Sequence, residues 1–150
     1  MKTRHNRQRG VTMLELLVVL AIGAILVIVA MPSFLKTKYH FALQEAALTL
    51  VQDLRTTQAN AIRQGTTATL AYAGTHQSYQ DFCNANSCTP LDNSGNAATS
   101  VSFNSSGYVT TPASMPWTVT MISCVTGEQL QVQLQRTGRI QTSTPTVSHC

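Results

Sequence analysis

The sequence predicts an α+β fold in which one long N-terminal helix packs on a small antiparallel β-sheet. Three observations predict this fold. An unbroken apolar run occupies residues 11–31, an amphipathic helical pattern continues to Gln64, and alternation of polar and apolar residues begins at Thr66. The 150 residues suffice for one small globular head once the apolar run is set aside.

Residues 1–10, MKTRHNRQRG, are polar and basic and show no periodicity. Such a segment is typical of a processing leader and not of folded structure. It holds four of the ten lysines and arginines, whereas all six acidic residues follow it. Its removal would leave equal numbers of basic and acidic residues, so the formal charge of +4 is no argument for nucleic-acid binding. Positive charge beside an apolar helix instead predicts that this end stays in the cytoplasm and that the remainder faces outward.

Residues 11–31 are apolar or small except for Thr12 and Glu15. At about 1.5 Å per residue the run reaches roughly the 30 Å of a bilayer core, so we expect a membrane-spanning helix. A secretory signal peptide fits less well, because its apolar region is usually about 7–15 residues long and precedes a small-residue cleavage site. A lipoprotein signal is excluded, since the first cysteine of the chain is Cys83.

Pro32 follows the apolar run, where it can kink a helix without ending it, because the helical pattern resumes beyond it. Apolar residues then recur at spacings of three, four and seven, which predicts an amphipathic helix with one buried stripe. These residues are Leu43, Ala47, Leu50, Leu54 and Ala61. Arg63 and Gly65 are signals for a helix C-terminus. The helix is therefore expected to run from about Thr12 to Gln64.

The composition changes after the helix to threonine, serine, valine, glutamine and asparagine, with alternation that predicts antiparallel strands with one buried face. The strands are expected in TTATLAYA (66–73), TSVSF (99–103), WTVTMIS (117–123) and QLQVQL (129–134). Residues 81–98 are predicted to form a loop. Turn signals at 105–107 and 126–128 separate strands, and the second indicates a hairpin. Trp117 is expected in the core.

The four cysteines are Cys83, Cys88, Cys124 and Cys150. An even number in a small exported domain favours disulfides, and three pairings are possible. We favour Cys83 with Cys88, which closes a short polar loop, and Cys124 with Cys150, which attaches the tail to the sheet. A zinc site is the alternative, but the cysteine spacing is loose and only two histidines lie beyond the helix. We therefore expect no metal and no other cofactor.

Glu15 needs a compensating partner, because a carboxylate within a membrane segment costs on the order of 2.5–3.5 kcal/mol. If the chain is cut after Gly10, the new amino group of Val11 lies at the helix end. The Glu15 of a neighbouring subunit would neutralise that amino group in a low-dielectric environment. The alternative is a carboxylate near the bilayer edge that snorkels or is protonated.

The run from Arg9 to Leu20, RGVTMLELLVVL, resembles the class III signal of type IV prepilins and type II secretion pseudopilins. The shared features are a basic leader that ends in glycine, a hydrophobic first mature residue and a glutamate at the fifth mature position; the later Pro32 also matches. The resemblance implies that a prepilin peptidase cleaves between Gly10 and Val11 and N-methylates Val11. It also implies that Glu15 docks the subunit into a filament.

The rest of the chain is similar to the GspH/FimT family of minor pilins and pseudopilins, which share a helix, a small sheet and a late Gly-Arg motif. The matching segments are 58–70, 103–109 and 129–140. The resemblance implies a type IV pilin-like fold with a removable leader (1–10), a transmembrane and filament-core helix (11–32) and a periplasmic domain (33–150). The implied partners are other pilins or pseudopilins, prepilin peptidase and the bacterial inner membrane, which the chain would cross once before it joins a pilus or pseudopilus.

Some DNA-binding members of that family carry Gly-Arg-x-Arg near the C-terminus, for uptake during natural transformation. Here the stretch 138–141 reads GRIQ and lacks the second arginine, so Arg136 and Arg139 are the candidate DNA contacts. The alternative is that Arg139 solvates a strand end beside a glycine turn. No catalytic triad, paired carboxylates or phosphate loop stands out, so we expect no enzyme. The leading interpretation is a structural minor pilin or pseudopilin active in filament assembly or priming, and the alternative is a DNA-binding minor pilin.

Overall fold

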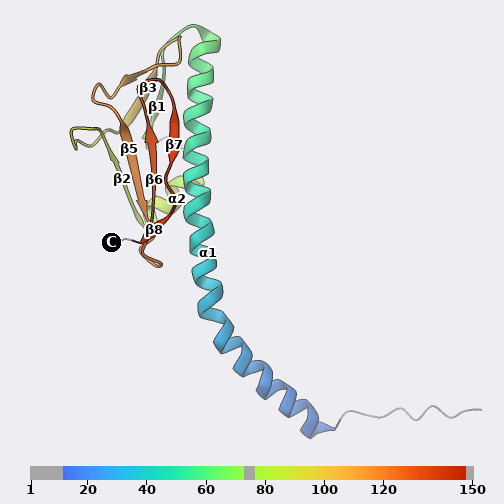
Figure 1. Ribbon diagram of the computed structural model, residues 1–150. Helices are drawn as coiled ribbons and strands as arrows, with labels where there is room; N and C mark the ends of the chain where they lie inside the picture. Colours follow the sequence, from blue (N-terminus) through green and yellow to red (C-terminus); the bar gives the residue numbers. More distant parts are fainter. Residues whose placement is uncertain (1–11, 73–76, 148–150) are drawn as a thin grey trace, which may run out of the picture. The chain divides into compact units, whose positions relative to one another are not determined.

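The computed structural model describes residues 12–72 and 77–147, and the chain divides into two compact units. The first unit, Met1–Leu35, contributes the N-terminal part of helix α1 (Met13–Gln64). The second unit, Lys36–Cys150, contains the rest of α1 and all the other elements (Figure 1). The helix begins one residue after the expected start, Thr12, and ends at the expected residue, Gln64, so the predicted span is confirmed.

One short helix and eight strands follow α1 in the described part of the chain. They are β1 (Ala68–Ala71), α2 (Gln77–Ala85), β2 (Ser87–Leu91), β3 (Ser100–Phe103), β4 (Val109–Thr111), β5 (Trp117–Ile122), β6 (Glu128–Leu134), β7 (Ile140–Thr142) and β8 (Thr146–Val147). A three-stranded sheet has the order β1-β3-β4. A five-stranded sheet has the order β2-β5-β6-β7, and β8 also pairs with β6. Every pairing is antiparallel, as expected, although the division into two sheets was not predicted.

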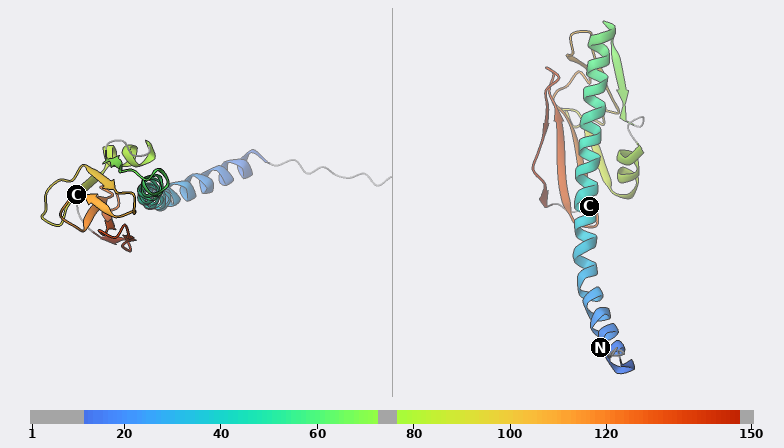
Figure 2. Two further views of the ribbon diagram at one scale, coloured as in Figure 1. Left: turned by 90° about the horizontal axis from the view of Figure 1, so that it is seen from above. Right: turned by 90° about the vertical axis from the view of Figure 1, so that its right-hand side faces the viewer.

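Within the second unit, α1 buries the predicted apolar stripe. Its members are Leu43, Ala47, Leu50, Leu54 and Ala61, each at most 1% exposed. The helix ends at Gly65, whose φ of 64° is the left-handed conformation of a glycine cap and whose amide donates to the Ile62 carbonyl at 3.4 Å. In Figure 2, β1 and α2 lie on one side of this part of α1 and β7 lies on the other.

The two longest strands supply the other side of the core. Burial alternates along β5 and β6, and Val119 faces Val132 across the pair. This alternation is what an antiparallel sheet with one covered face requires. Trp117 is 1% exposed, and its ring nitrogen donates to the Ala98 carbonyl at 3.1 Å, so it belongs to the core as predicted.

The prediction of a loop over residues 81–98 is wrong for its first half. Helix α2 extends to Ala85, because Tyr79 and Phe82, three residues apart, give it one buried side. Strand β2 follows and pairs with β5 along its whole length. Backbone hydrogen bonds hold this pairing, so it forms although the side chains of β2 are mostly polar. Only the segment 92–99 is a loop, and it contains a turn in which the Gly95 amide donates to the Asp92 carbonyl at 3.0 Å.

Candidate assembly site

Glu15 lies in the first turn of α1, directly after a residue that caps the helix. The Glu15 amide donates to the Thr12 hydroxyl at 3.3 Å, and the Leu16 amide donates to the Thr12 carbonyl at 3.2 Å. Thr12 and Glu15 therefore have the spacing of a capping box, in which a carboxylate three residues after the cap favours the helix N-terminus. The T-x-x-E pattern is present in the sequence, but the sequence-based predictions assigned no role to Thr12.

The predicted cleavage and methylation site, Gly10 and Val11, lies outside the described residues. The structure consequently describes Glu15 and its cap without the amino group that would be its partner. Within the first unit, the Glu15 side chain is exposed.

The surface around Glu15 is apolar. Within the first unit, large hydrophobic side chains are exposed by about half or more on every side of the helix. They are Met13, Leu14, Leu16, Leu17, Val18, Val19, Leu20, Ile22, Ile25, Leu26, Val27, Ile28, Val29, Met31, Phe34 and Leu35. Among the described helices, α1 is the one long and apolar enough to cross a membrane. A helix that is hydrophobic all round requires lipid or other helices as its surroundings.

Pro32 lies inside α1, so it does not end the helix. The missing amide hydrogen of a proline removes one backbone hydrogen bond of the ladder. The kink at this position stays a prediction.

The head carries a second stripe of exposed apolar side chains on α1, away from the centre of the buried stripe, and exposed Arg55 interrupts it. Phe41, Leu48 and Ile62 are 61%, 67% and 51% exposed, at spacings of seven and fourteen residues. Seven residues make nearly two helical turns, so the three side chains lie along one side of the helix. The sequence contained this second periodicity, but the sequence interpretation used only the stripe that the head itself buries.

The three segments on which the expected similarity to the GspH/FimT family rests meet at one place in the head. The Gln58 side chain on α1 donates to the Gly107 carbonyl at 2.9 Å, in the turn between β3 and β4. Gly138, in the turn between β6 and β7, has a φ of 78°, and a β-carbon there would lie 2.6 Å from that same carbonyl oxygen. The Val109 amide also donates to the Arg136 carbonyl at 2.9 Å. Gly138 therefore permits a close approach of two turns and a helix.

The two candidate DNA-contact residues lie on the β6–β7 turn, and both side chains are exposed. The two side chains differ in the hydrogen bonds that they make. The Arg136 guanidinium donates to the Ala113 carbonyl, so it also holds the loop before β5. Exposed Tyr108 belongs to the neighbouring turn. The glycine turn beside Arg139 agrees with the structural alternative for this residue.

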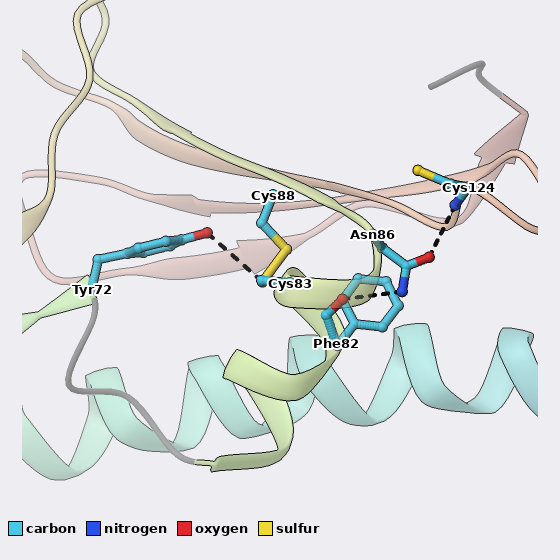
Figure 3. The surroundings of a disulfide bond; sticks show 6 residues. All are labelled: Tyr72, Phe82, Cys83, Asn86, Cys88 and Cys124. Atoms are coloured by element: carbon cyan, nitrogen blue, oxygen red, sulfur yellow. Dashed lines mark hydrogen bonds between the residues drawn. A yellow bond between two sulfur atoms is a disulfide. The ribbon is translucent and has the colours of Figure 1, made fainter.

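The structure contains the expected disulfide between Cys83 and Cys88, with a Cα–Cα distance of 5.3 Å (Figure 3). The Tyr72 hydroxyl lies 3.9 Å from the Cys83 sulfur. Cys124 is not a free cysteine, and its predicted partner Cys150 lies outside the described residues. The pairing of Cys124 with Cys150 therefore stays a prediction.

A polar contact between α1 and the sheet was not predicted. The His40 Nδ1 atom lies 2.8 Å from a carboxylate oxygen of Glu128, and the Gln44 amide nitrogen lies 2.9 Å from His40 Nε2. The two partners are 88 residues apart in sequence, so no local pattern signals the pair. Among the described residues, no group of three or more histidine, cysteine or acidic side chains is placed to hold a metal ion.

A family model described as the prokaryotic N-terminal methylation motif matches residues 5–31. The match includes Gly10, Val11 and Glu15 and ends within the apolar part of α1. It supports a type IV pilin-like subunit that is processed as a prepilin, assembles with other pilins and is anchored by a single membrane helix, and it points to a structural subunit and not to an enzyme. Comparison with curated proteins and with solved structures finds no match.

Proposed function

We propose that this chain is a minor pilin or pseudopilin of the GspH/FimT type that takes part in assembly or priming of a type IV pilus or a type II secretion pseudopilus. The observation that carries the proposal is a capped, exposed glutamate in the first turn of a helix that is apolar on every side. Prepilin peptidase would remove residues 1–10 and methylate Val11. Residues 11–32 would then anchor the subunit, and residues 33–150 would form its periplasmic domain.

The proposed role of Glu15 is electrostatic. Its carboxylate would pair with the Val11 amino group of a neighbouring subunit when the apolar helices pack together. A register that leaves the carboxylate without a cation in this low-dielectric interior would carry a desolvation cost of several kcal/mol. Pairing would therefore select one axial register among many that are equally apolar.

The exposed stripe of Phe41, Leu48 and Ile62 supports the same proposal. The apolar side chains that the head leaves exposed on α1, on either side of Arg55, leave surface for other helices. The stripe would extend subunit packing from the membrane helix into the head.

The test is incorporation of Glu15 variants into filaments sheared from cells. We expect Glu15→Ala to insert in the membrane but to be absent from the sheared fraction. Glu15→Gln is the more specific variant, because glutamine preserves the capping box and removes the charge. We expect it to be excluded as well.

The matched control is Glu45→Ala, which removes an exposed carboxylate from the head part of the same helix. It should enter filaments at the wild-type level. Normal amounts of Glu15→Gln in filaments would show that the carboxylate acts only as a helix cap, and the proposed electrostatic docking would then be wrong.

DNA capture is the second candidate function, and one observation favours it. The exposed arginines of the β6–β7 turn lie next to the turn that carries exposed Tyr108, and an aromatic ring beside cations is suited to stack a base. Two arginines are nevertheless a small electrostatic footprint, which predicts weak, salt-sensitive binding.

A gel-shift titration of the full chain in detergent against single-stranded and duplex DNA, at several salt concentrations, tests this candidate. Binding that weakens in Arg136→Ala/Arg139→Ala and is unchanged in Lys36→Ala/Lys38→Ala would support DNA capture. Lys36 and Lys38 are exposed cations outside the turn, so the double lysine variant is the charge-matched control. The absence of binding at low salt would reject DNA capture and leave the structural role.

A further inference from the structure

Asn86 links two distant parts of the head through one side-chain amide. It lies inside the loop that the Cys83–Cys88 disulfide closes, directly after α2. Its nitrogen donates to the Phe82 carbonyl at 3.0 Å, and its oxygen accepts a hydrogen bond from the Cys124 amide at 3.0 Å (Figure 3). The disulfide loop is thereby joined to the turn between β5 and β6, 38 residues later in the chain.

The β5–β6 turn, residues 123–128, is held together by its own hydrogen bonds. The Ser123 amide donates to the Glu128 carbonyl and the Gly127 amide donates to the Ser123 carbonyl, both at 2.8 Å. The Glu128 amide also donates to the Thr126 hydroxyl at 3.4 Å. Ser123 at the start of the turn is fully buried.

The far end of the same turn contacts α1. Glu128 pairs with His40 at 2.8 Å, and the Gln44 amide contacts the other nitrogen of the His40 ring. The turn is therefore held by Asn86 at Cys124 and by His40 at Glu128, in addition to the bonded sulfur of Cys124 and the pairing of Glu128 with Val147 of β8. All of these contacts lie within the second unit.

We propose that the Cys83–Cys88 disulfide is a redox-sensitive latch on the β5–β6 turn, with Asn86 as the link. A closed disulfide restricts the conformations of the residues inside its loop, so little entropy is lost when Asn86 is held against both of its partners. When a dithiol reduces the bond, two cysteine thiols form, the dithiol becomes a disulfide, and the loop gains conformational freedom. The Asn86–Cys124 hydrogen bond then weakens, and the turn loses one of its attachments, while the His40–Glu128 pair and the β8 pairing remain.

Hydrogen exchange of the full chain in detergent, measured by mass spectrometry over residues 123–128, tests the latch. Cysteine-to-serine variants are preferable to a chemical reductant, which would also act on Cys124. We expect about tenfold faster exchange of the Cys124 amide in Asn86→Ala, which corresponds to the loss of one typical hydrogen bond. Cys83→Ser/Cys88→Ser should change exchange in the same direction.

Asn84→Ala is the matched control, because Asn84 is exposed in the same disulfide loop and its side chain has no hydrogen bond within the described residues. It should exchange like the wild type. Wild-type exchange over residues 123–128 in either Asn86→Ala or the double serine variant would overturn the proposal. Equal acceleration at the Leu70–Val101 pair of the other sheet in Asn86→Ala would also overturn it, since the effect would then be a general loosening of the head.

Discussion

Tyr79 carries a buried hydroxyl for which the described part of the chain offers no hydrogen-bond partner. Its ring is fully buried and meets the ring of Tyr72 edge-on, with centroids 5.3 Å apart. Burial raises the pKa of Tyr79, and the neighbouring Tyr72 raises it further. Burial also raises the pKa of Tyr72. The folded head therefore keeps protons on both rings at a pH where an unfolded chain loses them.

This difference predicts alkaline unfolding. Below about pH 10 both states are protonated and the full stability is present. As the pH rises beyond that value, the unfolded state releases protons that the folded state retains, so the free energy of unfolding falls. Tyr79→Phe has no proton to release at this position, and circular dichroism should show its unfolding shifted to higher pH.

The same variant removes an unsatisfied polar atom, so its free energy of unfolding at neutral pH should rise by about 1–3 kcal/mol. Tyr108→Phe is the matched control, because Tyr108 is 51% exposed. It should leave both the alkaline transition and the neutral stability unchanged. A lower neutral stability in Tyr79→Phe would show that the hydroxyl has a partner in the folded protein.

Some single residues of the candidate site could be predicted from the sequence and others could not. Glu15 stood out because a charge inside an apolar run is costly, and the Cys83–Cys88 pairing followed from a short spacing in a polar segment. Asn86 and the His40–Glu128 pair act across large sequence separations. Their roles come from tertiary contacts, which local sequence patterns do not encode.

At the scale of elements, two turns and one helix meet at Gln58. Gly107 and Gly138 both adopt positive φ, and Gly138 is buried where the turns approach each other. A β-carbon on Gly138 would collide with the Gln58 side chain and with the backbone oxygen of Gly107. The position of the late Gly-Arg motif, Gly138-Arg139, therefore depends on close packing against Gln58 and Gly107 as well as on the geometry of its own turn.

Gly138→Ala is therefore expected to destabilise the head more than a glycine substitution in open space. Gly95 is the matched control, because its φ of 79° is nearly the same and no atom lies within 4 Å of a β-carbon built there. Gly95→Ala should cost about 1–2 kcal/mol from the backbone alone. Gly138→Ala should cost about 1–3 kcal/mol more from overpacking, measured by denaturant unfolding. Equal losses in the two variants would contradict the close approach.

The elements with a long periodic pattern were predictable, and the short polar ones were not. The α1 stripe repeats over many turns, and β5 and β6 alternate for six and seven residues. Helix α2 and strand β2 have nine and five residues, and tertiary contacts stabilise them. Two buried aromatic side chains hold α2, and the ladder with β5 holds β2.

At the scale of the whole molecule, the two units differ in what they bury. The head encloses its own core, whereas the described part of the first unit leaves nearly all of its apolar surface exposed. The family match covers residues 5–31, most of which belong to that exposed helix. The exposed apolar helix requires surroundings that keep it from water. Lipid would provide them before filament assembly, and the helices of other subunits would provide them afterwards.

We propose that the chain is trimmed after Gly10 and is then built into a filament. Intact-mass measurement of this chain in filaments sheared from cells that contain prepilin peptidase tests both parts at once. We expect a mature chain that begins at Val11. A different N-terminus, or absence of the chain from filaments of peptidase-positive cells, would contradict the account.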